Sequence, residues 1–376
     1  MSELLLGFRI SVAIATFVAG AGCDPSGAFT FPGESKTATE DRDVTAPEHV
    51  AGSGIDVQTP VGSVDIASDP SLKEIKITAK LSAFGKTDEE AKARLQDGKI
   101  KVSRRADSVL EVVAELPKID GVINGECSFV VRVPDAKGAK VKSGNGSLTI
   151  KGLGGAAELD ASVGAIKVID QGGSVGANSG NGSISVTKTK GEVRAATSVG
   201  AVKIEDASGI VNARSGSGSI VVKNAGGDVK ADASVGSISI YNAAGAVTAT
   251  SGNGSITISG ATRVRAKASV GGVTIDNVGG EVDAGTGNGS IIFKSAQDSD
   301  PSFKLNASVG SVTVHLRAGA TGSIEAGTSV GNVTINGTRK PESVIGERNS
   351  KKIVLKETGP ASKVHTGNGS ITITLD

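Results

Sequence analysis

The chain has 376 residues and a formal net charge of +1, because 40 basic side chains nearly balance 39 acidic ones. Such a chain creates no long-range field, so we expect neither nucleic acid nor an anionic membrane surface as a partner. Aromatic residues make up 2% of the chain and tryptophan is absent, whereas glycine occurs 53 times. Any core must therefore be thin and built from Ile, Val and Ala.

Residues 1–22 have the pattern of a signal peptide. The apolar stretch from Ile10 to Gly22 is too short to span a bilayer but suits the apolar part of a secretory signal. The small residues before Cys23 resemble the lipobox of bacterial lipoproteins, in which the cysteine is cut free and acylated. We therefore expect an exported protein with lipidation at Cys23, anchored to a membrane of the cell envelope on the periplasmic side or at the cell surface.

Two alternatives stay open for this segment. Ala19-Gly20-Ala21 also fits an ordinary secretory cleavage site, which would leave Cys23 as a free thiol, and the apolar stretch also fits a signal anchor. Residues 23–50 follow and are rich in Pro, Gly, Ser, Thr and charge, which predicts a flexible tether.

Residues 51–142 are predicted to hold a first coil and a capping segment. A capping box from Thr87 to Glu90 predicts a short helix that ends near residue 96. Cys127 is expected to be a small buried residue of a strand. Such an insert can cover the open end of a stack of coils, which otherwise presents unpaired strand edges. Further strands of the insert are expected near residues 75–81, 99–103, 109–116 and 128–133.

Residues 143–294 form a regular array. A glycine returns every 18 residues from Gly146 to Gly254, and then continues with small slips. Two and four positions after each glycine stand apolar, mostly branched residues, such as Ile184 and Val186, and a second strand signature precedes the next glycine. A fixed period with internal alternation predicts an all-β fold. We expect a single-stranded parallel β-solenoid, right-handed by default, with two short strands in each coil of about 18 residues.

The array also has a second period of 36 residues. The residue before the turn glycine alternates between valine and a polar residue, as at Val199, Ser217, Val235 and Asn253. Gly200 is expected to need a backbone conformation that branched side chains avoid. Residues 295–376 are predicted to form irregular coils and a cap, with residues 340–357 as a degenerate coil and residues 367–373 as the last coil.

These parts together resemble the bacterial putative-adhesin family of cell-envelope β-solenoids. The resemblance rests on the repeated Gly-x-Val-x-Val pattern, the insertion that begins at Thr87, the strand that ends at Val133-Pro134 and the turn from Thr366 to Ser370. It covers about residues 52–376. The resemblance implies an exported β-solenoid of unknown biochemical role, and it carries over no functional residues.

The sequence predicts no catalytic, cofactor-binding or metal site. His49, His315 and His365 stand far apart, and catalysis or metal binding requires side chains that converge. Outward positions of the second strand carry charge, and a coil of 18 residues places Arg263 beside Glu281 and, two residues on, Arg265 beside Asp283. Outward positions of the first strand carry hydroxyls, at Ser147, Thr149, Ser183, Ser185, Ser237, Ser239, Ser255 and Thr257.

The hydroxyl positions fit either a solvated strand face or a flat surface that binds ice or a polysaccharide. The leading hypothesis is a non-enzymatic, adhesin-like rigid rod of the cell envelope that binds a protein or polysaccharide. One alternative is a carbohydrate-active β-helix enzyme or a polysaccharide-binding protein, and another is a self-assembling envelope scaffold. Short turns and the lack of tryptophan argue against the enzyme.

Overall fold

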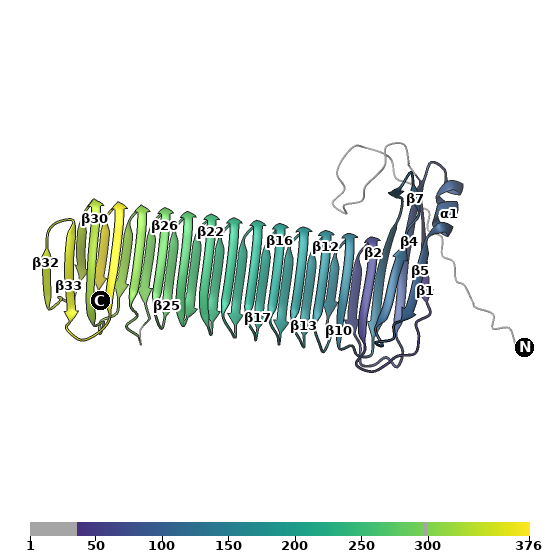
Figure 1. Cartoon of the computed structure of the whole chain (residues 1–376), viewed down its shortest axis with the longest axis horizontal. Helices are drawn as coiled ribbons and strands as arrows, with labels where there is room; N and C mark the ends of the chain where they lie inside the picture. Colours follow the sequence, from purple (N-terminus) through teal and green to yellow (C-terminus); the bar gives the residue numbers. More distant parts are fainter. Residues whose placement is uncertain (1–35, 297–298) are drawn as a thin grey trace, which may run out of the picture. The chain divides into compact units, whose positions relative to one another are not determined.

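The structure is a computed structural model that describes residues 36–296 and 299–376. Cys23, the predicted signal peptide and the first part of the predicted tether lie outside the described residues. The chain divides into two compact units, residues 1–181 and residues 182–376, which are described separately (Figure 1). Strands make up 66% and helix 3% of the described residues, so the predicted all-β solenoid class is confirmed. The described residues contain no helix that is long and apolar enough to cross a membrane.

The first unit contains two sheets and a separate short hairpin. The order is β1-β4-β9-β3-β11-β13 in one sheet and β5-β6-β2-β10-β12-β14 in the other, and β7 and β8 form a separate hairpin. The elements are β1 (Lys36–Val44), β2 (Gly54–Val61), β3 (Val64–Ser68), β4 (Lys76–Gly85), α1 (Asp88–Asp97), β5 (Lys99–Arg104), β6 (Leu110–Glu115), β7 (Lys118–Ile119), β8 (Val122–Ile123), β9 (Glu126–Val133), β10 (Gly138–Asn145), β11 (Leu148–Lys151), β12 (Ala157–Val163), β13 (Ile166–Gln171) and β14 (Val175–Asn181).

The tether prediction is wrong for residues 36–44, because they form β1. This strand pairs antiparallel with β4 along its whole length, from Lys36 opposite Gly85 to Val44 opposite Ile77. The guanidinium of Arg42 donates to the carbonyl oxygen of Gly98 at 2.9 Å, just past the end of α1. A cation is favourable there because the last carbonyls of a helix carry partial negative charge.

The helix α1 begins at the predicted capping box, with one difference in its partners. Thr87 Oγ1 accepts a hydrogen bond from the amide of Glu90 at 3.2 Å, as expected. The Glu90 carboxylate accepts instead from the amide of Lys86 at 2.8 Å, one residue before the cap. Ala91 and Leu95 form the buried side of the helix, again as the sequence predicts.

The predicted strands of the insert are present and extend both sheets of the first coil. β9 runs parallel to β3 and antiparallel to β4, while β6 runs parallel to β2 and antiparallel to β5. Cys127 lies in β9 and is fully buried, which confirms the prediction for this residue. Burial raises the pKa of its thiol from 9.0 to about 12.

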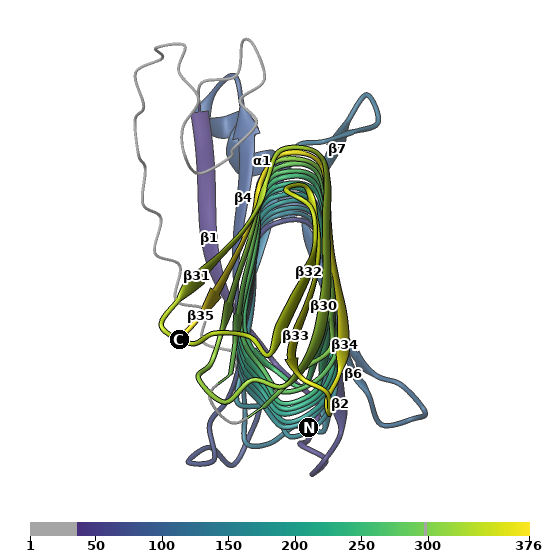
Figure 2. The same cartoon turned by 90° about the vertical axis from the view of Figure 1, so that its left-hand side faces the viewer.

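The second unit is a stack of coils with one strand in each of two facing sheets (Figure 2). Sheet A has the order β15-β17-β19-β21-β23-β25-β27-β29-β35-β31, and sheet B has the order β16-β18-β20-β22-β24-β26-β28-β34-β30-β33-β32. The strands are β15 (Ile184–Thr189), β16 (Val193–Val199), β17 (Val202–Ala207), β18 (Val211–Ser217), β19 (Ile220–Ala225), β20 (Val229–Val235), β21 (Ile238–Ala243), β22 (Ala246–Asn253), β23 (Ile256–Ala261), β24 (Arg263–Val270), β25 (Val273–Val278), β26 (Val282–Asn288), β27 (Ile291–Ser295), β28 (Phe303–Val309), β29 (Val312–Leu316), β30 (Gly322–Val330), β31 (Val333–Gly337), β32 (Ser343–Gly346), β33 (Ser350–Lys356), β34 (Ala361–Asn368) and β35 (Ile371–Leu375).

The core of each coil is as thin as the composition requires. In the coil of β15 and β16, the residues Ile184 and Val186 of sheet A and Val193 and Ala195 of sheet B are all at most 2% exposed. Equivalent residues of the next coil lie directly opposite, so branched side chains form continuous rows along the stack. Because each row is extended by the next coil, a single coil could not bury these side chains alone.

The turn between the two strands of a coil requires glycine. Gly200 has a φ of +141°, and a Cβ at this position would overlap the carbonyl oxygen of Gly182 in the preceding coil. The hydroxyl of Ser215, in the following coil, donates to the Gly200 carbonyl oxygen at 2.9 Å. Buried hydroxyls make the same bond in other coils of this unit, namely Thr197 to Gly182, Ser251 to Gly236, Thr286 to Gly271, Thr366 to Gly310 and Thr328 to Gly369.

The C-terminal part of the second unit departs from the sequence predictions in two ways. Residues 340–357 do not form a degenerate coil, because β32 and β33 pair as an antiparallel hairpin and β33 also pairs antiparallel with β30. The last coil of the chain, β34 with β35, is not the last of the stack. It lies between the coil of β28 and β29 and the coil of β30 and β31, as the yellow strand within the green ones shows in Figure 1.

Candidate functional site

The residues that the structure describes do not gather into a catalytic or metal-binding cluster. Within them, no group of three or more His, Cys, Asp or Glu side chains could hold a metal ion. His49 Nε2 contacts Asp135 at 2.7 Å in the first unit, whereas His315 lies in sheet A and His365 in sheet B of the second unit. Cys23, the predicted lipidation site, lies outside the described residues.

The outer surface of sheet B carries the predicted charges, and oppositely charged side chains pair between coils. Arg263 Nε lies 3.9 Å from Glu281 and Arg265 Nε lies 3.4 Å from Asp283, so both predicted neighbours are confirmed. Both arginine side chains are more than 60% exposed, and each pair therefore contributes at most about 1 kcal/mol. Each of these carboxylates therefore has a cation of the preceding coil beside it.

The outer surface of sheet A is different, because seven consecutive coils of the stack present two rows of uncharged residues. One row follows the turn glycine directly and the other lies two residues further along the strand. We call these rows the hydroxyl face. Its members are Ser237, Ser239, Ser255, Thr257, Gly272, Thr274, Ser290, Ile292, Ser311, Thr313, Ser370, Thr372, Asn332 and Thr334, in stacking order.

The hydroxyl face is regular because its residues are held by sheet hydrogen bonds. Thr257 lies opposite Thr274, and Thr372 lies opposite both Thr313 and Thr334. Neighbouring strands are about 4.8 Å apart and alternate residues of one strand about 6.6 Å apart, so seven coils make a surface roughly 29 Å long. Charge borders this surface on two of its strands, where Asp276 and Lys294 follow Thr274 and Ile292 by two residues and lie opposite each other.

The serines next to the turns are already oriented by the backbone. Ser255 Oγ accepts from the amide of Gly272 at 3.3 Å, and Ser290 Oγ accepts from the amide of Ser311 at the same distance. A serine hydroxyl that accepts one bond still has its proton to donate. These serines therefore offer oriented hydroxyl donors at fixed spacing, and the fourteen members of the face carry no charge.

An exposed apolar row runs along the turns beside the hydroxyl face. We call it the valine ridge, and its members Val199, Val235, Val270, Val309 and Val330 are between 46% and 63% exposed. A polar residue separates each valine from the next, including Asn368 between Val309 and Val330. The sequence order places Val309 and Val330 in succession, whereas the inserted last coil restores the alternation in space.

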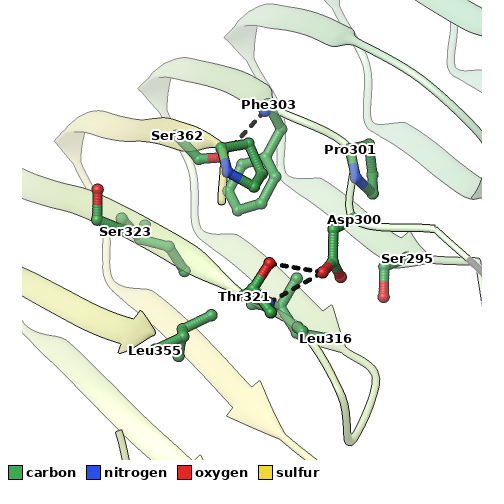
Figure 3. A pocket seen from close by; sticks show the side chains of 12 residues that line it. Ser295, Asp300, Pro301, Phe303, Leu316, Thr321, Ser323, Leu355 and Ser362 are labelled. Carbon is green, nitrogen blue, oxygen red and sulfur yellow. Dashed lines mark hydrogen bonds between the residues drawn. The ribbon is translucent and has the colours of Figure 1, made fainter. Parts of the chain in front are cut away.

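The described residues also line a pocket where the last coil enters the stack (Figure 3). Its volume is about 10 Å³, which is room for one water molecule. The Asp300 carboxylate accepts bonds from the amide and the hydroxyl of Thr321 at 3.1 and 2.8 Å, and it pairs with Arg317 Nη2 at 3.0 Å. Since the Asp300 carboxylate is already bonded to Thr321 and Arg317 and the volume is small, the pocket is part of the packing between coils and not a ligand site.

The sequence identified the hydroxyl positions only in part. Its examples stopped at Thr257, and in the preceding coils Lys203 and Val221 interrupt the pattern, as they do in the structure. The part richest in hydroxyls lies further along, where only Gly272, Ile292 and Asn332 lack one, and it includes Thr372 only because the last coil is inserted. The repeated Ser-x-Thr pattern at Ser311–Thr313 and Ser370–Thr372 could have indicated these further hydroxyl positions in the sequence.

Comparison with known proteins agrees with this architecture. Residues 227–374 match the model of the family described as Toastrack DUF4097. This part of the chain is therefore similar to the Toastrack family, and the family resemblance predicted from the sequence is confirmed. None of the curated proteins is significantly similar to the chain.

Three solved structures resemble the chain over most of its length. One is a putative cell adhesion protein from Clostridium sporogenes, with 12% identity, a TM-score of 0.20 and coverage of 91% of this chain and 100% of that one. A second is a putative adhesin from Bacteroides fragilis, with 15% identity, a TM-score of 0.27 and coverage of 91% and 97%. A third is a putative adhesin from Parabacteroides distasonis, with 11% identity, a TM-score of 0.26 and coverage of 91% and 98%.

Proposed function

We propose that the protein is a non-enzymatic, exported β-solenoid of the cell envelope that binds an extended neutral polysaccharide, in the manner of an adhesin. The hydroxyl face is the observation that carries the proposal. A neutral sugar chain presents donors and acceptors along its length and has no charge for a basic or acidic surface to match. An ordered array of uncharged hydroxyls can form hydrogen bonds with such a chain without taking charged groups out of water.

The valine ridge supplies the apolar part of the same surface. Sugar rings have apolar faces, and the exposed methyl groups of Val235 and Val270 stand beside the hydroxyl rows. Each coil offers only a few weak contacts, so useful affinity requires several coils to bind one chain at once. The proposal includes the lipid anchor at Cys23, which would hold the solenoid at a membrane.

The test is a glycan array probed with the mature protein, followed by titration of the best neutral glycan. In one variant, Thr257→Val and Thr274→Val remove two hydroxyls of the face with little change of shape. In the matched control, Thr248→Val and Thr250→Val remove two outward hydroxyls of sheet B. Two lost hydrogen bonds of about 0.5–1.5 kcal/mol each should weaken binding by roughly tenfold.

The control should bind as the unmodified protein does. Equal affinity of both variants, or binding only to charged glycans, would refute the hydroxyl face as the binding surface. A protein captured by the face, with no glycan bound, would replace the polysaccharide as partner.

A further inference from the structure

The stacking order of the second unit contains one exception, and it lies at the C-terminus. The chain leaves the coil of β28 and β29, passes over one coil position, and builds the coil of β30 and β31 with the hairpin of β32 and β33. Residues 361–375 then return and fill the position that was passed over. The last coil is therefore the one coil of this unit that fills a position between two already connected neighbours.

The position for the last coil is bounded on both sides by strands that need a partner. Gly310 donates to Asn368 at 2.9 Å on one side, and Gly369 donates to Val330 at 2.9 Å on the other. The buried Thr366 hydroxyl donates to the Gly310 carbonyl oxygen at 2.7 Å. Ile371 and the other inward residues of the last coil are at most 4% exposed. Without this coil, two sheets would each have a gap with unpaired edges.

Contacts that do not involve the last coil hold the gap open. Asp300 fixes the start of the connection through its bonds with Thr321 (Figure 3) and with Arg317. Arg339 Nη1 donates to the carbonyl oxygens of Ala318 and Ala320 at 3.0 and 2.7 Å, which braces the same connection from the other side. Closing the gap would also place Val330 beside Val309 and break these contacts. The gap is thus a formed slot for one coil.

The last coil is joined to β33 by the turn at residues 357–360. It can therefore leave this slot when that turn opens, while β28 and β30 keep their own connections. Gly359 has a φ of +137°, and a Cβ there would lie 2.5 Å from the amide nitrogen of Gly322. A turn this tight has no room for a larger side chain. Added strain in the turn therefore favours release of the last coil from the slot.

We propose that two copies of the chain associate by exchanging their last coils, each copy inserting residues 361–376 into the slot of the other. Every contact of the slot is retained in the exchanged pair, so the exchange alters only the turn at residues 357–360. The partner is a second copy of this chain, joined at the C-terminal part of the second unit. This interaction is independent of the proposed polysaccharide binding.

The experiment uses full-length chains with single cysteines across the slot. Asn306 of β28 and His365 of β34 are exposed Cα partners, at a strand spacing that a disulfide can bridge. A tagged Asn306→Cys chain is mixed with an untagged His365→Cys chain, both with Cys23→Ser. Cys127 can stay, because burial raises its pKa to about 12. The mixture is exposed briefly to mild urea, returned to buffer and oxidised, and linked pairs are counted on a non-reducing gel.

The proposal predicts a disulfide between the tagged and the untagged chain. The matched control is Thr250→Cys mixed with Lys267→Cys, which are Cα partners in regular coils that cannot be exchanged, and it should give only background linkage. Gly359→Ala in both copies should raise the linked fraction by about tenfold. The proposal is overturned if the slot mixture links no more than this control while one chain with both Asn306→Cys and His365→Cys forms its internal disulfide.

Discussion

Gly200→Ala should be far more costly than an alanine substitution at another glycine of the same unit. At Gly200 the φ of +141° lies where side chains are strained, which costs about 1–3 kcal/mol. A Cβ would also lie 2.6 Å from the Gly182 carbonyl carbon, so the two coils must separate locally. Their separation weakens the bond from the Gly182 amide to the Val199 carbonyl oxygen, which is 2.8 Å long, at about 1 kcal/mol. The expected loss is about 2–4 kcal/mol.

Gly285 provides the matched control, because it lies in β26 without a positive φ and its nearest outside atom is 3.7 Å from a Cβ. Gly285→Ala should change stability little, or raise it by about 0.4–1 kcal/mol through the unfolded chain. The assay is urea unfolding followed by circular dichroism, with hydrogen exchange of the amides near residue 200. Equal free energies of unfolding for the two variants would refute the close-contact explanation of the turn glycines.

Three further predictions concern the anchor, the buried thiol and catalysis. Cys23→Ser should prevent acylation and block processing, so the chain should run as the unprocessed precursor on a gel, and an equally processed and equally membrane-bound chain would contradict lipidation. Between pH 9 and about 12, Cys127 ionises in the unfolded state but not in the folded state. In this range the free energy of unfolding should therefore fall with pH by about 1.4 kcal/mol per unit more steeply than in Cys127→Ala. Identical slopes for the two proteins would show that the thiol titrates normally. The purified protein should release no reducing ends and no unsaturated sugars from polysaccharides, and release abolished by Glu281→Gln would establish an enzyme instead.

The solenoid could be predicted because its interactions are local in the sequence. Each coil contacts its neighbours, so the same side chains recur every 18 residues and both predicted pairs, such as Arg265 with Asp283, follow from the coil length alone. The strand β1 could not be recognised in the same way. It is an edge strand whose only buried apolar side chain is Ala38, and most of its residues are polar. Its place depends on pairing with β4 and on the bond from its own Arg42 to Gly98, and both partners are far away in the sequence.

The position of the last coil could not be predicted from the order of the coils along the chain. We assumed that coils stack in chain order, which is the usual behaviour of repeat proteins. The alternation of valine and polar residues contradicts that order, because Val309 is followed by Val330 along the chain. The alternation is satisfied when Asn368 lies between them, as the structure shows. The continuity of the hydroxyl face also depends on the inserted last coil, because Thr372 lies between Thr313 and Thr334.

The most direct test of the proposed binding surface compares two deletions of nearly equal length in the second unit. Removal of residues 236–270 joins Val235 to Gly271 and takes away two coils of the hydroxyl face. Removal of residues 200–235 joins Val199 to Gly236 and takes away two coils outside the face. Both junctions preserve the order of a valine followed by a turn glycine, so both chains should fold. We predict that the first deletion weakens glycan binding in an isothermal titration through lost avidity, while the second leaves the affinity unchanged. Equal affinities of the two folded deletion chains would contradict the hydroxyl face as the binding surface.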